Sequence, residues 1–504
     1  MRPKDRPVVD RISRRSRIVF FGVAGSALLA STALAEGGYF SGQNGARAAG
    51  RGGAFAARAD DLGAMLYNPA GLAELDGTMG QVANQLSYNT YSYTRSPTVD
   101  YGHPQNDGSF PTASFAPVQN LKPWQALLPM VGAASRLGLT NWTFALAVIA
   151  PSGVGREQYP EGGGQRYMLV KRDAIMLSYA ASAAWRASDT FGVGVTAQWI
   201  HVPRLIYSLM IDGTRSPGEI NPVSSNLDML ATINGSDPMT LNAIVGAWAR
   251  PVPWFELAVS GQVLPAKIVA HGPLSLQPKG SNLGTLTTKR NGMAANDVTV
   301  TLPLPLLARA AARYRHLVAG VELFDLELDA EYETWSRVNR FTVDGNHIRV
   351  DYAGDYLFID QIQIEKHWKD TLTLKLGGDF AAVPDLLTLR AGALYVTPVA
   401  PTAYTSLDFS TAAQMGGSVG ASLLVGRWTL SLAYQLRMQP TVRVAESNGR
   451  VYQQTPGSAC TAPYTDTDNC NSHTLGTPGP VVNAGTYQAT SHLVLLDLIY
   501  RSGR

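Results

Sequence analysis

Strict alternation of apolar and polar residues is the sequence feature that most constrains the fold of this chain. The run 428–436 reads WTLSLAYQL, and the runs 191–199 (FGVGVTAQW) and 371–380 (TLTLKLGGDF) repeat the pattern. A period of two places successive side chains on opposite faces of a β-strand. Each run is about ten residues long, which is the length of a tilted strand that crosses a bilayer. The alternation therefore predicts strands with one face toward lipid and one toward an enclosed interior.

The connections between these runs are unequal in length. Tight turns such as 187–189 alternate with long polar or glycine-rich stretches at 211–238, 271–293 and 446–487. This asymmetry is typical of outer-membrane barrels. We predict an all-β, transmembrane antiparallel barrel of about 14 strands, near 80–95, 110–136, 142–150, 166–186, 190–210, 239–250, 254–270, 298–316, 320–343, 356–381, 387–397, 414–426, 428–445 and 488–500.

A soluble β-sandwich would also alternate, but two observations favour the membrane. The apolar faces carry Tyr and Trp at their ends, where membrane-interface belts place them. Only 16% of the residues are charged, which suits a barrel with an apolar outer wall. Prolines at 111, 117, 303 and 305 are expected to interrupt the strands near 110 and 298.

The first 35 residues have the order of a secretory signal peptide. A basic region, an apolar stretch at 18–32 and the small residues Ala33 and Ala35 follow one another, so we expect cleavage after Ala35. Removing the signal's seven basic and two acidic residues from totals of 41 and 38 leaves 34 and 36. The mature chain thus lacks the basic excess of nucleic-acid-binding proteins. We expect Cys460 and Cys470 to form a local disulfide in an exported protein.

Residues 36–79 do not alternate, are rich in Gly and Ala, and contain the sequence Asn68, Pro69, Ala70 and Gly71. We place the barrel and its long extracellular loops at 80–504, and a small-residue segment before its first strand is a candidate plug. The stretch from Gly45 to Leu72 resembles the N-terminal hatch of the FadL/TodX family of outer-membrane transporters of hydrophobic compounds, such as long-chain fatty acids and aromatic hydrocarbons. The resemblance continues through the turn at 151–153, residues 332–336 and residues 368–371.

The resemblance implies a barrel of 14 strands whose lumen is closed by the hatch. It also implies that Asn68, Pro69 and Ala70 lie at a kink in strand three, where substrate leaves sideways into the bilayer. Proline fixes its own φ and lacks an N–H, while asparagine can bond backbone groups of an interrupted ladder. A plain Asn-Pro turn without a role in transport is the alternative.

One predicted strand carries four acids on a single face, at Glu327, Asp329, Glu331 and Glu333. Four carboxylates cannot face lipid, so this face must line the lumen. The preceding strand carries three basic residues with the same spacing: Arg309, Arg313 and Arg315. We expect the two sets to pair and to connect the wall to the hatch, with substrate or ion selection as the alternative.

Two apolar groups in the long loops are candidates for ligand capture. One comprises Phe110, Phe115, Trp124, Leu127 and Leu128; the other, which has helical spacing, comprises Leu227, Met229, Leu230 and Ile233. Packing of loop on loop is the alternative for both groups.

No enzymatic signature is found in the sequence. The eight histidines are scattered and no Gly-x-Ser-x-Gly motif occurs. We expect a monomeric channel with no cofactor and no metal, in contact with outer-membrane lipid, that admits hydrophobic molecules passively by extracellular capture, hatch movement and lateral exit. A general polar-solute porin and a surface-structural barrel are the alternatives.

Overall fold

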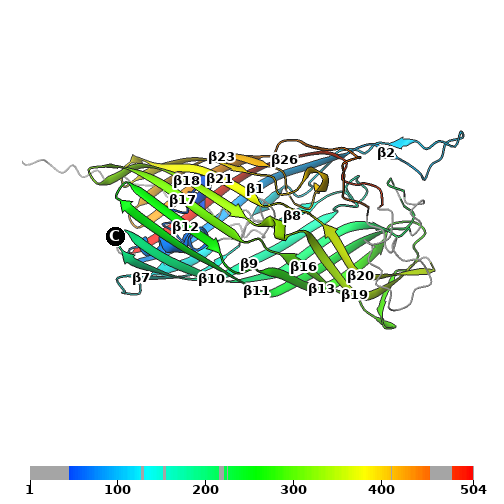
Figure 1. Cartoon of the computed structure of the whole chain (residues 1–504), viewed down its shortest axis with the longest axis horizontal. Helices are drawn as coiled ribbons and strands as arrows, with labels where there is room; N and C mark the ends of the chain where they lie inside the picture. Colours follow the sequence, from blue (N-terminus) through cyan, green and yellow to red (C-terminus); the bar gives the residue numbers. More distant parts are fainter. Residues whose placement is uncertain are drawn as a thin grey trace, which may run out of the picture.

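The computed structural model describes residues 45–126, 130–150, 155–214, 221–223, 225–352, 354–409, 411–453 and 479–502. Over these residues the chain forms a closed antiparallel barrel of 14 passes, seen from the side in Figure 1. Several passes consist of two or three strands in line, because irregular stretches interrupt the hydrogen-bond ladder. The predicted signal peptide, residues 1–35, lies outside the described residues.

The first seven passes are β1 (Thr78–Arg95); β4 (Val118–Gln119), β5 (Trp124–Ala126) and β6 (Met130–Ser135); β7 (Trp142–Ile149) and β8 (Arg156–Gln158); β9 (Lys171–Ser188); β10 (Phe191–Asp212); β11 (Asp228–Val252); and β12 (Phe255–Gln262) and β13 (Lys267–Pro278). The second seven are β16 (Asp297–Pro303) and β17 (Leu307–Val318); β18 (Val321–Glu333) and β19 (Arg340–Tyr352); β20 (Asp355–Glu365) and β21 (Thr371–Val383); β22 (Leu387–Val396); β23 (Gln414–Val425); β24 (Trp428–Met438) and β25 (Val442–Val444); and β26 (Gly485–Ser502). Two small hairpins, β2 (Thr98–Val99) with β3 (Thr112–Ala113) and β14 (Thr287–Arg290) with β15 (Met293–Ala294), lie among the loops, as do the 3-10 helices η3 (Trp335–Arg337) and η4 (Thr402–Tyr404).

The barrel closes where β1 pairs with β26 along its whole length, with Thr78 opposite Ser502. One end of the barrel, at the left in Figure 1, carries the tight turns, and we call it the short-turn end. Gly320 and Gly426 adopt φ values of 84° and 62° there, as two-residue hairpin turns require. The opposite, long-loop end carries the extended connections.

The two-residue alternation separates the two faces of the wall as the sequence predicts. Leu430 and Leu432 of β24 are exposed on the outside, whereas the alternating Ser431 and Gln435 are buried inside. Aromatic residues form a belt near the short-turn end, as in the Trp142–Trp185 and Trp428–Tyr500 pairs. A second belt nearer the long-loop end contains the Tyr88–Trp124 and Tyr179–Trp199 pairs. Outward-facing apolar side chains between two aromatic belts fit a bilayer.

Several predicted strand limits are wrong. The fourth pass begins at Lys171 and not at 166, and the expected strands at 320–343 and 356–381 are divided by η3 and by residues 366–370. The expected loops at 211–238 and 271–293 are shorter, because β10 and β11 pair from Asp212 opposite Asp228 and β13 continues to Pro278. The strands near 110 and 298 are interrupted, as their prolines predict: the first is in pieces, and β16 ends at Pro303.

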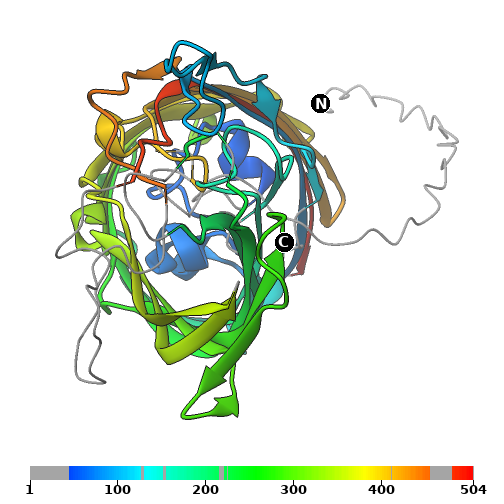
Figure 2. The same ribbon diagram turned by 90° about the vertical axis from the view of Figure 1, so that its right-hand side faces the viewer.

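Residues 45–75, which precede β1, lie inside the barrel, as Figure 2 shows in a view along its axis. We call residues 45–75 the luminal segment. It contains α1 (Ala46–Gly50), α2 (Ala64–Tyr67) and η1 (Pro69–Glu74), and most of its side chains are buried. Small residues allow the segment to lie directly on the wall: a Cβ at Gly377 or Gly392 would come within 2.0 or 2.1 Å of the backbone of Arg51.

Candidate functional site

A buried arginine fastens the first turn of the luminal segment to the wall. The guanidinium of Arg51 lies 2.8 Å from a carboxylate oxygen of Asp325, 2.8 Å from Glu327 and 2.7 Å from Asp379. Its Nε also donates to the carbonyl of Ala54 at 2.8 Å. Arg51 is completely buried, so three carboxylates of β18 and β21 surround one cation away from water.

The acidic face of β18 also binds the backbone of the luminal segment. Asp329 accepts hydrogen bonds from the N–H groups of Phe55 and Ala56, both at 3.0 Å, and Glu327 accepts one from Ala57 at 2.7 Å. These N–H groups belong to an irregular stretch and have no ladder partner. The wall therefore supplies hydrogen-bond acceptors that the segment cannot provide for itself.

The other members of the predicted charge ladder also face the interior. Glu331 pairs with Arg309 and, at 3.1 Å, with Lys375. Glu333 accepts from the indole of Trp335 at 3.0 Å.

Arg313 contacts Asp325, Glu256 and Glu322, and Arg315 contacts the latter two at 3.1 and 2.7 Å. Arg309 reaches the luminal segment directly, donating to the carbonyl of Leu66 at 2.7 Å.

The Asn-Pro-Ala motif lies against the fifth and sixth passes of the barrel. Asn68 donates to the carbonyl of Ala247 on β11 at 3.2 Å and to that of Ala56 at 3.0 Å, and its Oδ1 accepts from the N–H of Ala70. Glycines on the wall make the room: a Cβ at Gly246 would lie 2.0 Å from Asn68 Oδ1, and one at Gly194 would lie 2.4 Å from Pro69.

The role of the motif at a kink in strand three stays a prediction. η1, which begins at Pro69, contacts β7 of the third pass but also β9, β10 and β11, and the motif's hydrogen bond to the wall goes to β11. The sequence could not reveal this, because the partner is 179 residues away. Gly71 of the motif packs inside the segment, where a Cβ would lie 2.2 Å from the carbonyl oxygen of Ala59.

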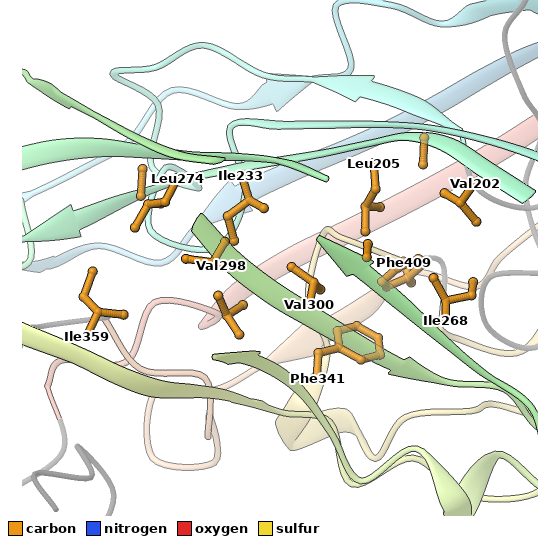
Figure 3. Close-up of a cluster of buried hydrophobic side chains, with 14 of the residues drawn as sticks. Val202, Leu205, Ile233, Ile268, Leu274, Val298, Val300, Phe341, Ile359 and Phe409 are labelled. Carbon is orange, nitrogen blue, oxygen red and sulfur yellow. The ribbon is translucent and has the colours of Figure 1, made fainter. Parts of the chain in front are cut away.

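The lumen between the luminal segment and the long-loop end contains an apolar cluster. Its side chains come from β10, β11, β13, β16 and β19 and point toward one another, as Figure 3 shows for Val202, Ile233, Ile268, Val300 and Phe341. A narrow pocket of about 50 Å³ lies among them, next to Phe409. Among the described residues that line it, Arg172 alone is charged.

The lumen at the short-turn end has the opposite character. A chamber of about 480 Å³ lies on that side of the luminal segment. Its lining contains many charged side chains of both signs, including Arg58, Arg250, Glu256, Asp379 and Arg390. An apolar molecule that enters the pocket meets a mostly apolar lining. In the chamber, the same molecule would displace water from charged side chains, which costs free energy.

The second group of predicted capture residues is not a surface helix. Met229 and Leu230 lie on β11 and are buried. The backbone N–H and C=O groups here bond to β10, because the two strands pair along their whole length, so no helix forms. Leu227 packs partly buried against the apolar cluster, and Ile233 lines the pocket. The expectation of a short amphipathic helix is wrong, but these residues belong to the apolar interior.

The first group is scattered. Phe110 is exposed in a loop beside Tyr101, and Phe115 lies under the guanidinium of Arg95 at 4.8 Å. Trp124 is 64% exposed on the outer face of β5, next to Tyr88, so it belongs to an aromatic belt and not to a capture site. Leu127, Leu128, Cys460 and Cys470 lie outside the described residues. In the part of the chain that is described, no cluster of three or more His, Cys, Asp or Glu could hold a metal ion.

Sequence reasoning missed four residues that hold the luminal segment. Arg51 and Asp379 are described above, and Asp497 of β26, fully buried, accepts from the N–H of Ala46 at 2.6 Å. A fourth, Asp325, lies two residues before Glu327 on β18 and therefore on the same face of the strand. It could have been added to the charge ladder on that basis. Arg51 could have been noticed as a long cation in a segment of Gly and Ala.

Comparison with known proteins identifies this architecture. Residues 26–462 match the family model described as outer membrane protein transport protein (OMPP1/FadL/TodX). The chain belongs to this family. It is therefore an outer-membrane β-barrel of a family that transports hydrophobic compounds, and the family, fold class and location predicted from the sequence are confirmed. Family members are transporters or channels and not enzymes.

Solved structures agree in fold. A Pseudomonas aeruginosa FadL homologue aligns with a TM-score of 0.68 at 15% identity over 92% of this chain and 99% of that one. The toluene transporters TbuX of Ralstonia pickettii and TodX of Pseudomonas putida align with TM-scores of 0.55 and 0.58, both at 13% identity, over 91% and 93% of this chain and 98% of each of theirs. At these identities the likeness shows the fold alone. A search of curated proteins finds no match.

Proposed function

We propose that this protein takes up hydrophobic small molecules passively and releases them sideways into the outer membrane. A molecule enters from the long-loop end, occupies the apolar pocket, and leaves through the wall when the luminal segment shifts. No cofactor or energy source is required, because transfer from water into lipid releases about 25 cal/mol per Å² of apolar surface.

The division of the lumen is the observation that carries this proposal. An apolar cluster lies in the half toward the long loops, and charged pairs line the chamber beyond the luminal segment. A hydrophobic cargo thus has a favourable site above the segment and an unfavourable one below it, which favours lateral exit over passage to the periplasm. The solved relatives named as toluene transporters accord with an apolar cargo.

The luminal segment provides a gate with unequal attachment. Its first part is held by the fully buried ion pairs of Arg51, whereas η1 and the Asn-Pro-Ala motif contact the wall through the hydrogen bond from Asn68 and through partly exposed ion pairs of Glu74 with Arg250 and Arg186. We assign the movement to the second part, at residues 62–75, because its ion pairs are partly exposed and its other bonds to the wall, such as those that Arg309 and Ser260 donate to backbone carbonyls, involve no buried carboxylate.

Uptake by cells or proteoliposomes tests the proposal. Asn68→Ala combined with Pro69→Ala should leave the barrel heat-modifiable on a gel but slow the uptake of a hydrophobic probe such as oleate or toluene. Uptake equal to that of the unmodified protein would contradict the assigned gate. Gly80→Ala is a matched control, since nothing lies within 4 Å of the Cβ it would add.

Liposome swelling separates the remaining alternatives. A general porin would admit sugars at a rate that does not depend on the luminal segment, and a structural barrel would show no uptake defect on deletion. We expect neither behaviour. Sugar permeation by the unmodified protein without hydrophobic uptake would overturn the proposal.

A further inference from the structure

We infer that the apolar pocket selects uncharged molecules over ionised amphiphiles, because the two cations that the described residues place beside it are already paired with carboxylates of the protein itself. This inference rests on the proposed function and narrows its cargo to neutral compounds: hydrocarbons, alcohols and esters.

The first cation is Arg172, the charged residue of the pocket lining. Its guanidinium lies 3.1 Å from the carboxylate of Glu157, and both side chains are 2% exposed. The guanidinium also lies over the ring of Phe409, at 4.7 Å from the centroid. An ionised ligand that approached Arg172 would therefore meet Glu157 at the same position.

The second cation is Lys366, which contacts the pocket-lining ring of Phe341. Lys366 pairs with Asp408, with side-chain exposures of 3% and 2%, and its Nζ lies 5.0 Å from the ring of Phe341. Asp408 also accepts a hydrogen bond at 3.4 Å from the hydroxyl of Tyr207, which lines the pocket. The Lys366–Asp408 pair therefore has no net charge, and its carboxylate already accepts hydrogen bonds from the protein.

A ligand carboxylate in the pocket would lose its water without gaining an available counter-ion. Built-in carboxylates hold their cations without the entropy cost of binding, so a ligand cannot displace them cheaply. Repulsion between the ligand carboxylate and those of Glu157 and Asp408 adds to this desolvation cost. The low dielectric constant of the interior strengthens the repulsion.

A neutral ligand meets none of these penalties. The Nε–H of Arg172 is buried and has no acceptor among the described residues. It can donate to a hydroxyl or carbonyl oxygen of an uncharged ligand. The alkyl or aromatic part would then widen the pocket by rearranging side chains such as Met176 and Leu205.

A nearby ion pair provides the control. Asp173 pairs with Arg204 at 2.9 Å, and neither residue lines the pocket. Neutralising Asp173 removes a nearby carboxylate that is also paired with an arginine, but it does not change the charge of the residues that line the pocket.

The test compares dodecanoate with its methyl ester, which has the same chain and no charge. Binding to the full-length mature protein in nanodiscs is measured by calorimetry at pH 8. We expect the ester to bind at least about tenfold more tightly. Glu157→Gln and Asp408→Asn should each strengthen dodecanoate binding about tenfold and leave ester binding unchanged, whereas Asp173→Asn should change neither.

Equal binding of acid and ester to the unmodified protein would overturn the inference without touching the proposed function. So would variants that fold, as judged by heat modifiability, and gain no affinity for the acid. If neither ligand binds and no hydrophobic probe is taken up, the proposed function itself fails. Because the acid-to-ester comparison needs only the unmodified protein, it decides the matter even if a variant does not fold.

Discussion

Replacing Arg51 with methionine should release the luminal segment from the wall. The substitution removes the cation that three buried carboxylates share, at 2.8, 2.8 and 2.7 Å. Asp325 keeps Arg58 and Arg313 as partners, and Asp379 keeps Arg58 and Arg390. Glu327 loses its ion pair and keeps backbone N–H donors.

Removing one partner of a buried ion pair costs about 3–5 kcal/mol, and a change of about 1.4 kcal/mol alters an equilibrium tenfold. The equilibrium between seated and released segment should therefore shift by roughly two to three and a half orders of magnitude, less whatever Arg58 recovers by moving closer. Planar-bilayer conductance measures the result, because a released segment opens the lumen to ions. We expect frequent open-channel events that the unmodified protein rarely shows.

Two further variants serve as a control and as a test of the cause. Arg349→Met removes an exposed arginine paired with Asp351 and should leave conductance unchanged, since exposed pairs contribute little. Adding Glu327→Gln to Arg51→Met removes the uncompensated charge and should restore part of the seating, as a double-mutant cycle would show. If Arg51→Met conducts no more than Arg349→Met, the ion pairs do not hold the segment and the reasoning is refuted.

Three other substitutions test the wall, the seat of the motif and the pocket. Gly246→Ala would place a Cβ 2.0 Å from Asn68 Oδ1 and should raise conductance, whereas Gly80→Ala should not; equal behaviour of the two would count against a tight seat. Leu432→Arg puts a charge on the outer face of β24, where it should lower the free energy of unfolding in lipid by about 2–4 kcal/mol, as measured by denaturant titration. Phe341→Ala should cost about 3–5 kcal/mol in the same assay, and added toluene should recover more stability in this variant than in the unmodified protein, because an apolar cavity accepts a small aromatic molecule.

Local patterns were sufficient for much of the fold. A strand's two faces are fixed by residue parity, so the alternation of Leu432 with Ser431 determined which side chains meet lipid. Parity likewise placed Glu327 and Glu331 inside. Limits such as those of β9 and β18 were less predictable, because hydrogen bonds to the partner strands on both sides, β7, β8 and β10 for β9 and β17 and β21 for β18, decide where a ladder ends.

The capture residues show how a local pattern can mislead. Leu227, Met229, Leu230 and Ile233 have helical spacing, yet three of them lie on β11, since pairing with β10 outweighs a weak local preference. Trp124 looked like a loop residue and lies on the outer wall, because β5 pairs with β1.

By itself the sequence determined that this chain is a barrel with an apolar exterior and a charged interior, since parity and composition are properties of neighbouring residues; the family resemblance implied that the small-residue segment closes the lumen. Only the tertiary structure decided that Arg51 meets Asp325 and Asp379, that Ala46 meets Asp497 at a separation of 451 residues, and that Asn68 faces β11. The physical reason is closure: the ring brings first and last passes together, and the shear of the strands, which no local pattern encodes, sets which side chains share a level of the lumen.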